Sequence, residues 1–484
     1  MYRFHYRALI KITGILLVIE GLFMLTSIPF SLWYGGTDLY PILISAGITI
    51  LTGSVMWFTR RNYDQRDIGR REGYLIVSIT WIVISVFGAL PFYISGAIPS
   101  FTDACFETMS GFSTTGASIL RDIEIIPKGL LFWRSMTHWI GGMGIIVLSI
   151  AILPFLGYGG MSLFWAEVPG PEKDKLHPRI AVTARRLWGI YILLTFAMVF
   201  MELAGGMNLF DSLCHAFGAL SSGGFSPKNT SLAGYSPYLQ YVAILFMFLA
   251  GTNFTLHYLL LNGKAKKALS SQELHAYLLI LLIPSVIIAL ILIFTRSYGI
   301  EQAWRGALFN VVSIVTCTGF ANEDYMLWPS YAWFIIFLLM FSGGMAGSTS
   351  GGIKVVRHVL LFRNFSNVIQ RQVHKSAVIP VRLDKKPVNP KILHNVLAIF
   401  FLYIITFGIG SLLLTATGLD VISSMGSVVS CMGGIGPGLA TTGPVANYAH
   451  LTDFAKWVLN FMMLLGRLEL FSLFIVLHPA FWKQ

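Results

Sequence analysis

Ten stretches of this sequence are apolar over a length that could cross a lipid bilayer. A spanning helix needs about 20 mostly apolar residues, and 55% of the 484 residues are hydrophobic whereas only 12% are charged. The stretches are 8–33, 40–58, 75–97, 128–154, 187–205, 238–262, 275–295, 329–362, 394–417 and 454–480. Because segments of this kind satisfy their backbone polar groups internally as helices, the chain is predicted to be an all-α polytopic membrane protein.

The first apolar stretch follows a basic segment, MYRFHYR, and so has the outline of a secretory signal peptide. The apolar run is longer than a signal peptide needs, and no small-residue cleavage site follows it cleanly. We therefore expect this stretch to be a spanning helix.

The net charge of +12 does not indicate a nucleic-acid partner, because the distribution of the basic residues along the chain explains it. Most of the 34 Lys and Arg residues lie near the N-terminus or in alternate loops, at 3–11, 60–71, 173–186, 264–267 and 354–391. The positive-inside rule assigns such segments to the cytoplasm. With ten spans, both termini are expected on the cytoplasmic side of the membrane.

A repeated pattern follows the first two spans: a long apolar segment, a short apolar segment, a Gly-bearing loop and another long segment. The short segments are too short to cross a bilayer and too apolar to be exposed loops, which predicts re-entrant half-helices. They are 101–113, 208–221, 303–316 and 420–431. The sequence thus predicts four tandem helix–pore loop–helix units, preceded by two additional spans.

The loops after the half-helices align with glycine at the fourth place. They are 113–117 (STTGA), 221–225 (SSGGF), 316–320 (TCTGF) and 431–435 (CMGGI). Glycine lets successive backbone carbonyls face one axis, where they can replace the hydration shell of an ion. The predicted selectivity-filter residues are Thr114, Thr115, Gly116, Ser222, Gly223, Gly224, Cys317, Thr318, Gly319, Met432, Gly433 and Gly434.

In this interpretation the third and fourth places hold the cation, at Thr115, Gly116, Gly223, Gly224, Thr318, Gly319, Gly433 and Gly434. The acidic residues Asp103, Asp211 and Asp420 lie near the starts of three half-helices, where a negative charge suits the positive end of the helix and can cap it. Taken singly, each glycine could instead turn the chain or let two helices pack closely. The occurrence of four such loops in register favours a shared pore.

Three further motifs, at 133–144 (WRSMTHWIGGMG), 341–354 (FSGGMAGSTSGGIK) and 465–470 (LGRLEL), give the chain a recognisable pattern. With the four loops, the sequence resembles the Trk/Ktr/HKT superfamily of potassium transporters, and in particular its TrkH-like members. The resemblance covers essentially the whole chain. In this superfamily, glycine in all four filter loops accompanies potassium selectivity, whereas serine in the first loop accompanies sodium transport.

The resemblance also implies how the chain is divided and assembled. It implies two N-terminal helices within 1–72 and pore units at 73–186, 187–273, 274–391 and 392–484, around a pseudo-four-fold pore. It further implies a homodimer on a cytoplasmic ring of TrkA-like, RCK-type subunits that bind NAD or ATP/ADP. Beyond lipid and the transported K⁺, this chain itself is expected to need no cofactor.

A run of small residues interrupts the stretch 329–362 in the third unit. Each Gly costs about 1 kcal/mol relative to Ala in a helix, and the run contains Gly343, Gly344, Gly347, Ser348, Thr349, Ser350, Gly351 and Gly352. We interpret 343–352 as an intramembrane gating loop, as the resemblance also implies. A Gly-rich packing face remains the alternative, whereas a Walker loop is excluded by the absence of Gly-Lys-Ser/Thr.

Arg467 lies within the last apolar stretch, where an unpaired cation costs at least about 2.5–3.5 kcal/mol. The resemblance implies that it contacts the gating loop, and a purely structural ion pair is the alternative. Glu469, two residues away, faces another side of a helix and is a poor partner for it. Arg134 and His138, spaced i,i+4, are interpreted as structural, and the intramembrane acids Glu20 and Glu202 receive no assigned role.

The predicted function is therefore potassium uptake through a gated, channel-like pore, with an H⁺- or Na⁺-coupled symporter as the alternative. Coupled transporters usually contain inverted repeats, whereas these units run in parallel. An enzyme is not expected, because the histidines are scattered and no HExxH pair occurs.

Overall fold

The computed structural model describes residues 6–60, 70–142, 144, 180–374, 379–384 and 386–482. Within these ranges the regular secondary structure is helical apart from the hairpin of β1 (Arg382–Leu383) and β2 (Lys386–Pro387). The two strands are antiparallel, with Arg382 opposite Pro387 and Leu383 opposite Lys386. The prediction of an all-α membrane protein is confirmed.

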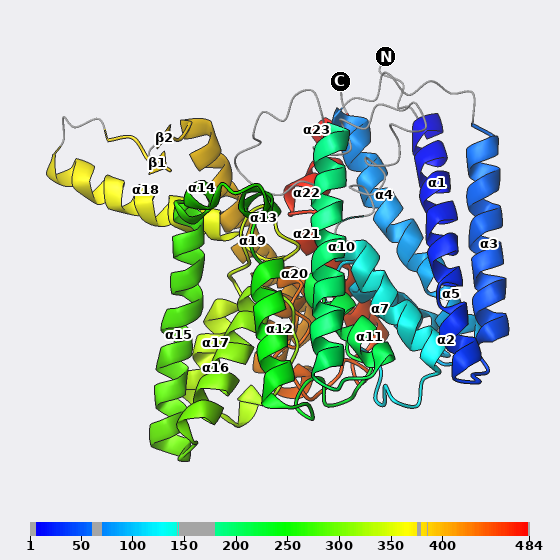
Figure 1. Cartoon of the computed structure of the whole chain (residues 1–484). Coiled ribbons are helices and arrows are strands. Elements are labelled where there is room, and N and C mark those ends of the chain that lie inside the picture. The colour runs from blue at the N-terminus through cyan, green and yellow to red at the C-terminus, as the bar shows by residue number, and fades with distance from the viewer. Residues whose placement is uncertain are drawn as a thin grey trace.

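The helices follow one another in a regular succession of long and short elements (Figure 1). In the first half of the chain they are α1 (Tyr6–Leu25), α2 (Ile28–Trp33), α3 (Leu39–Phe58), α4 (Arg70–Gly88), α5 (Leu90–Ile94), α6 (Phe101–Phe112), α7 (Lys128–Gly142), α10 (Ile180–Ala204), α11 (Leu209–Leu220), α12 (Pro237–Ala250), α13 (Phe254–Leu261) and α14 (Ala265–Leu269). In the second half they are α15 (Gln272–Arg296), α16 (Ile300–Val315), η2 (Tyr325–Leu327), α17 (Ser330–Leu339), α18 (Val355–Val373), α19 (Pro390–Thr415), α20 (Val421–Gly433), η3 (Ala440–Thr442), α21 (Asp453–Arg467), α22 (Phe471–Leu477) and α23 (Pro479–Trp482).

Six helical segments among the described residues are long and apolar enough to cross a membrane: 6–33, 39–58, 71–94, 185–204, 272–296 and 390–415. Two bent helix pairs raise this number to eight if each pair is one span. These segments correspond to eight of the ten predicted spans. Of the others, 128–154 is described only as far as α7 and residue 144, and 329–362 is divided between α17 and α18.

Two stretches predicted as continuous helices, 238–262 and 454–480, are broken. Between α12 and α13 the axis bends by 100°, and between α21 and α22 by 115°. At the first break, the Gly251 carbonyl accepts a hydrogen bond from the Met345 amide (2.9 Å), and the Phe254 amide donates to Gly347 (3.0 Å). At the second, Glu469 and Leu470 have positive φ angles of 53° and 56°, which end a right-handed helix.

The interruption predicted within 329–362 is confirmed. α17 ends at Leu339, α18 begins at Val355, and the described residues between them are not helical. After this interruption α18 runs away from the body of the molecule, across the direction of α15 (Figure 1).

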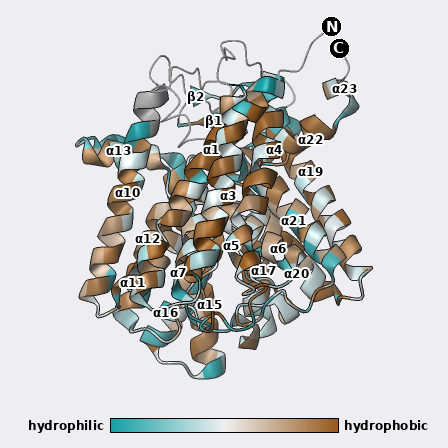
Figure 2. Cartoon of the chain, turned by 90° about the vertical axis from the view of Figure 1, so that its right-hand side faces the viewer, coloured by the Kyte–Doolittle hydropathy of each residue, from teal (hydrophilic) through white to brown (hydrophobic). Residues whose placement is uncertain are grey.

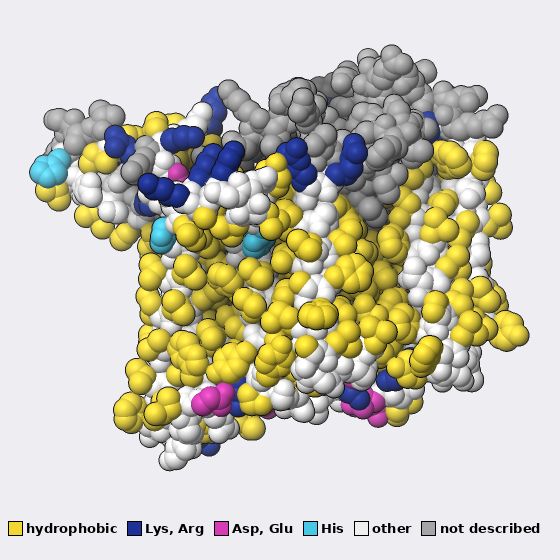
Figure 3. Space-filling model, in the orientation of Figure 1, with side chains coloured by type: hydrophobic (Ala, Val, Ile, Leu, Met, Phe, Trp, Pro, Cys, Tyr) yellow, Lys and Arg dark blue, Asp and Glu magenta, His cyan; other side chains and the backbone are white. Residues whose placement is uncertain are grey.

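Polarity divides the surface in the way a bilayer requires. In Figure 2 hydrophobic residues dominate the middle of the helices, and in Figure 3 an apolar band lies below an upper edge where Lys and Arg gather. The start of α1 and the short helix α23 lie toward this same basic edge (Figure 1).

Small residues allow α1 and α3 to pack closely. A Cβ atom at Gly14 would lie 2.8 Å from the Gly53 carbonyl oxygen, and one at Gly53 would lie 2.6 Å from the Gly14 oxygen. Such contacts between backbones are typical of membrane helix interfaces. The two N-terminal helices thus form a tight pair beside α4 and α7.

Candidate functional site

Four half-helices, α6, α11, α16 and α20, end in the four predicted loops. The side chains of Ser100, Asn208 and Asp420 accept hydrogen bonds from the first turns of α6, α11 and α20. α16 instead follows Gly299, which has no side chain. The prediction that Asp420 is a cap is confirmed. Asp103 and Asp211 lie in the first turns of α6 and α11, where a negative charge suits the positive end of the helix, whereas the capping side chains there are Ser100 and Asn208.

The four loops share one backbone conformation. In each, the second and fourth places have positive φ, with non-glycine residues at the second place of the first three loops. The φ values are 56° and 84° at Thr114 and Gly116, 57° and 76° at Ser222 and Gly224, 57° and 77° at Cys317 and Gly319, and 69° and 97° at Gly434 and Gly436.

The same conformation places the fourth loop two residues later than the sequence alignment did. The amide at the third place donates to the carbonyl five residues earlier: Thr115 to Ser110, Gly223 to Gly218, Thr318 to Ser313 and Ile435 to Ser430 (2.8–2.9 Å). Met432 and Gly433 lie inside α20. The geometric equivalents of Thr115 and Gly116 are therefore Ile435 and Gly436, and the predicted placement of Gly434 at the fourth position is corrected.

Each fourth-place glycine lies against the third-place carbonyl of another loop. A Cβ at Gly116 would be 2.1 Å from the Gly223 oxygen, one at Gly224 1.9 Å from the Thr318 oxygen, and one at Gly319 1.8 Å from the Ile435 oxygen. A Cβ at Gly436 would be 2.7 Å from the Thr115 oxygen, which closes the circle. The four loops thus surround a common centre, and glycine is required because the atom nearest to each added Cβ would be a backbone carbonyl oxygen. A ring of such carbonyls can replace the hydration shell of a cation.

A buried polar side chain stands behind each loop, nine residues before its fourth-place glycine. Glu107 accepts hydrogen bonds from Ser118, His215 contacts Ser226 (3.0 Å), Asn310 donates to Asn322 (2.9 Å), and Ser427 contacts Thr442 (2.9 Å). Each fastens a half-helix to the segment that leaves its loop. We did not single out these residues from the sequence, although Glu107 was visible there as a carboxylate in the middle of a half-helix.

The predicted gating segment lies against the second and fourth loops. The Thr349 hydroxyl donates to the Leu220 carbonyl (3.0 Å) and contacts the Ser222 hydroxyl (2.9 Å), so it lies at the end of α11. A Cβ at Gly351 would lie 2.1 Å from the Gly433 oxygen, at the end of α20. The segment thus packs against the carboxyl ends of two half-helices.

The base of this segment is tied together by further backbone contacts. The Gly343 amide donates to Ile353 (2.9 Å), and the Val355 amide donates to Gly344 (3.1 Å). The Ala346 amide donates to a carboxylate oxygen of Glu273, in α15, at 2.7 Å. The predicted gate residues that remain, Gly347, Ser348, Ser350 and Gly352, belong to the same compact turn.

Two cations flank the site. Arg467 donates to the Thr114 hydroxyl (3.3 Å) and to the Gly141 and Gly142 carbonyls, so it contacts the first loop and the end of α7. Buried Lys354 donates to the Ser350 carbonyl within the gating segment. Glu469, expected to be a poor partner for Arg467, instead forms an ion pair with Arg357. The sequence did not single out Lys354 as a gate residue.

At the opposite face, polar residues join the segments that follow the first and second loops. The Asn229 amide donates to Asp122 (2.8 Å) and holds the pKa of that carboxyl below its usual value. Beside it, Lys228 and Glu124 form a partly exposed ion pair of 3.4 Å. These contacts lie outside the bilayer-spanning segments.

Metal centres of the catalytic kind are not found in the part of the chain described here, where no three His, Cys, Asp or Glu side chains form a ligand group. The intramembrane acids Glu20 and Glu202 are fully buried within the helices. The chemistry available at the four loops is therefore that of backbone carbonyls and hydroxyls.

Comparisons with known proteins identify the family of the chain. The family model of the TrkH cation transport protein matches residues 41–483. The chain is 37% identical over 499 residues to the Trk system potassium uptake protein TrkH of Escherichia coli, covering 99% of this chain and 100% of that one. It is 36% identical over 482 residues to the protein of the same name in Halomonas elongata, covering 99% of each.

A solved structure gives the same result. The crystal structure of the potassium transporter TrkH from Vibrio parahaemolyticus matches with a TM-score of 0.89 at 35% identity, covering 99% of this chain and 100% of that one. The match extends over both the N-terminal helices and the loops that form the site. This multi-pass membrane chain, a transporter and not an enzyme, therefore belongs to the TrkH family of cation transport proteins.

Proposed function

We propose that this chain carries K⁺ across the bacterial cytoplasmic membrane, as the pore-forming subunit of a Trk-type uptake system. The pore is channel-like, gated and lined at its narrowest point by backbone carbonyls. Relatives that match over almost the full chain are named Trk system potassium uptake proteins. Their names support the choice of ion.

The observation that carries this proposal is the closed circle of four glycine–carbonyl contacts. Four helix–pore loop–helix units placed around a pseudo-four-fold axis explain why each fourth-place glycine meets the third-place carbonyl of another unit. The carboxyl ends of α6, α11, α16 and α20 lead directly into the loops, so the negative ends of their dipoles favour a cation there.

In this pore, K⁺ is coordinated at the third and fourth places of each loop. These are Thr115 and Gly116, Gly223 and Gly224, Thr318 and Gly319, and Ile435 and Gly436 in place of Gly433 and Gly434. Thr114, Ser222, Cys317 and Gly434 at the second place set the turn into the filter with their positive φ angles.

The gate is the segment 343–352, which Thr349 and Gly351 hold against the ends of α11 and α20 beside the filter. Lys354 and Arg467 place positive charge on the same side of the filter as this segment. This charge opposes the entry of a cation when no regulator is bound. Opening then requires the segment to leave the ends of α11 and α20.

The basic edge is assigned to the cytoplasm by the positive-inside rule, which also places both termini there (Figure 3). Exposed lysines at the start of α14, Lys264, Lys266 and Lys267, are available on that edge for cytoplasmic regulatory subunits of the RCK type. NAD or ATP/ADP would bind to those subunits and not to this chain.

A homodimer is proposed from the surface of α18. This helix leaves apolar side chains exposed along its length: Phe362, Phe365, Val368, Ile369 and Val373. It projects beyond the body of the molecule at the level of the basic edge (Figure 1), where a second copy can cover it.

The test is the reversal potential of the purified protein in lipid bilayers under opposed K⁺ and Na⁺ gradients. A Nernstian K⁺ response that is independent of pH and Na⁺ is expected, whereas a potential that follows either gradient would favour a coupled symporter. Gly116→Ser should lower the K⁺/Na⁺ permeability ratio, because its Cβ would displace the Gly223 carbonyl. A normal ratio in a well-incorporated Gly116→Ser protein would refute the filter assignment.

A further inference from the structure

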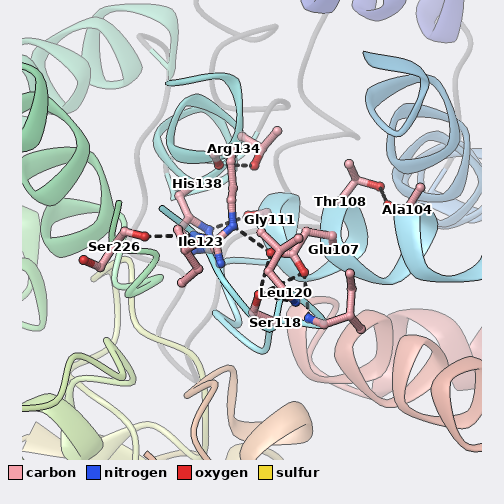
Figure 4. A network of polar contacts seen from close by, with 12 residues as sticks. Ala104, Glu107, Thr108, Gly111, Ser118, Leu120, Ile123, Arg134, His138 and Ser226 are labelled. Atoms are coloured by element: carbon pink, nitrogen blue, oxygen red, sulfur yellow. Dashed lines mark hydrogen bonds and ion pairs between the residues drawn. The ribbon is translucent and has the colours of Figure 1, made fainter. Parts of the chain in front are cut away.

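A buried ion pair lies directly behind the first two loops (Figure 4). Arg134 Nε, from α7, is 2.7 Å from Glu107 Oε1, from α6, and the two side chains are only 3% and 0% exposed. Removing two charges from water is costly, and one partner without the other costs more. A pair retained in such a place needs a role beyond packing.

Glu107 holds the segment that leaves the first loop. Its carboxylate accepts hydrogen bonds from the Ser118 hydroxyl (2.9 Å) and the Ile119 amide (2.9 Å), which follow Gly116 by two and three residues. The Ser118 carbonyl in turn accepts from the Tyr448 amide, beyond the fourth loop. The carboxylate therefore fixes the backbone that directly follows the filter residues of the first loop.

Arg134 holds the same point of the second loop. Its Nη1 donates to the Ser226 carbonyl (3.1 Å), two residues after Gly224, and its guanidinium lies 3.5 Å from the centre of the Phe225 ring. Glu107 and Arg134 thus fasten equivalent positions of two different loops and join them to each other.

His138, one turn further along α7, extends this contact to the filter itself. Its Nδ1 is 2.7 Å from the Gly111 carbonyl in α6, and its ring lies 3.9 Å from that of Phe225. The ring occupies the space beside Gly223, where a Cβ would lie 2.6 Å from it. Gly223 carries the carbonyl that faces Gly116.

The other units fasten their loops differently. The residues equivalent to Glu107 are His215, Asn310 and Ser427, so Glu107 is the one carboxylate in this set. In the described part of the chain, the side-chain hydrogen bonds of these three residues stay within their own units, as with His215 and Ser226 or Ser427 and Thr442. Glu107 instead pairs with Arg134 of its own unit, and Arg134 also donates to the Ser226 carbonyl of the second unit, so an ion pair supports the contact between the first and second loops.

We propose that Glu107 and Arg134 are positioning residues for ion selectivity, which fix the distance between the first and second filter loops. The proposal rests on the filter function proposed above. Because a carbonyl ring discriminates between ions by the position and number of its oxygens, loosening this pair should admit Na⁺ more readily. It should do so without changing any residue that contacts the ion.

The experiment compares K⁺/Na⁺ permeability ratios of purified variants in bilayers. Glu107→Gln and Arg134→Gln should each lower the ratio by about tenfold, the lower end of what partners that orient metal ligands contribute. The double variant should change the ratio by less than the product of the two single effects, because the residues act as a pair. Glu124→Gln is the matched control, since it removes an exposed ion pair between the same two segments.

Thermal stability is measured in parallel, since a merely structural pair would lower the melting temperature and leave the ratio unchanged. If Glu107→Gln does not incorporate into bilayers, Ser118→Ala is the variant that tests the proposal. It removes one hydroxyl and leaves the ion pair in place. It should lower the ratio about threefold, as the loss of one hydrogen bond predicts. A ratio equal to that of the unmodified protein in the variant that incorporates overturns the proposal.

The variant Gly116→Ser distinguishes a failure of the positioning proposal from a failure of the filter assignment. If Gly116→Ser lowers the ratio and the Glu107 variants do not, the filter assignment stands and the positioning role is wrong. If neither changes the ratio, both are wrong. If Glu107→Gln and Gly116→Ser lower it while Glu124→Gln does not, the positioning role is supported.

Discussion

The substitutions Gly436→Ser and Gly434→Ser should have different effects on the K⁺/Na⁺ permeability ratio, although a single residue separates these two glycines. Gly436 has φ of 97°, and its Cβ would lie 2.7 Å from the Thr115 oxygen. Gly434 has φ of 69°, and its nearest neighbours would be 3.9 Å away. Serine already occupies the position equivalent to Gly434 in the second loop, at Ser222 with φ of 57°.

The magnitudes follow from these geometries. A left-handed conformation costs a residue with a side chain about 1–2 kcal/mol, which is the whole expected penalty at Gly434. At Gly436 the φ angle lies outside the small left-handed region, which adds strain of about 1–3 kcal/mol. Ordinary contact begins at 3.4 Å, so the Thr115 carbonyl must also move by about 0.7 Å, with a cost typical of overpacking, about 1–3 kcal/mol.

A displaced carbonyl weakens K⁺ coordination, and a difference of about 1.4 kcal/mol between two ions is tenfold in their ratio. Gly436→Ser should therefore lower the K⁺/Na⁺ permeability ratio about tenfold, and Gly434→Ser should leave it within about twofold of the unmodified protein. Reversal potentials in planar bilayers with K⁺ on one side and Na⁺ on the other measure this ratio directly. The reverse outcome, a large change at Gly434 and none at Gly436, would refute the placement of the fourth loop.

Two further predictions concern the gate and the cytoplasmic face. Deletion of 344–350, or Arg467→Ala, should raise basal Rb⁺ uptake into liposomes at matched protein incorporation, and the two changes together should be less than additive. If both variants fold and conduct no faster than the unmodified protein, the gate lies elsewhere. Charge reversal of the lysines within 264–267 should weaken co-purification with an RCK-type partner, and unaltered binding would remove this part of the surface from the interface.

Much of the architecture could be predicted from the sequence because it depends on local properties. Lengths and hydropathy identified the half-helices, and α6 and α11 begin and end within a residue of the predicted bounds. The composition of 343–352 likewise predicted the end of α17, since a cluster of glycines disfavours a helix wherever it lies.

The features that were missed depend on contacts between distant segments. Glycines at 433, 434, 436 and 438 offer several plausible alignments of the fourth loop, and the contact of Gly436 with Thr115 selects one of them. The break after α12 lies at an ordinary Gly-Thr-Asn sequence and is stabilised by hydrogen bonds from Met345 and to Gly347. Glu107 could be recognised as a positioning residue only once Ser118 and Arg134 were seen beside it.

The circle of four loops has a consequence for how such a protein can change during evolution. Since the four quarters of the ring are encoded separately in one chain, a mutation alters one quarter and leaves three intact, whereas in a ring of identical subunits it would appear four times. Ile435 and Gly223 already occupy equivalent positions with different side chains. A pore of this design can therefore shift its ion preference in small increments, one quarter at a time.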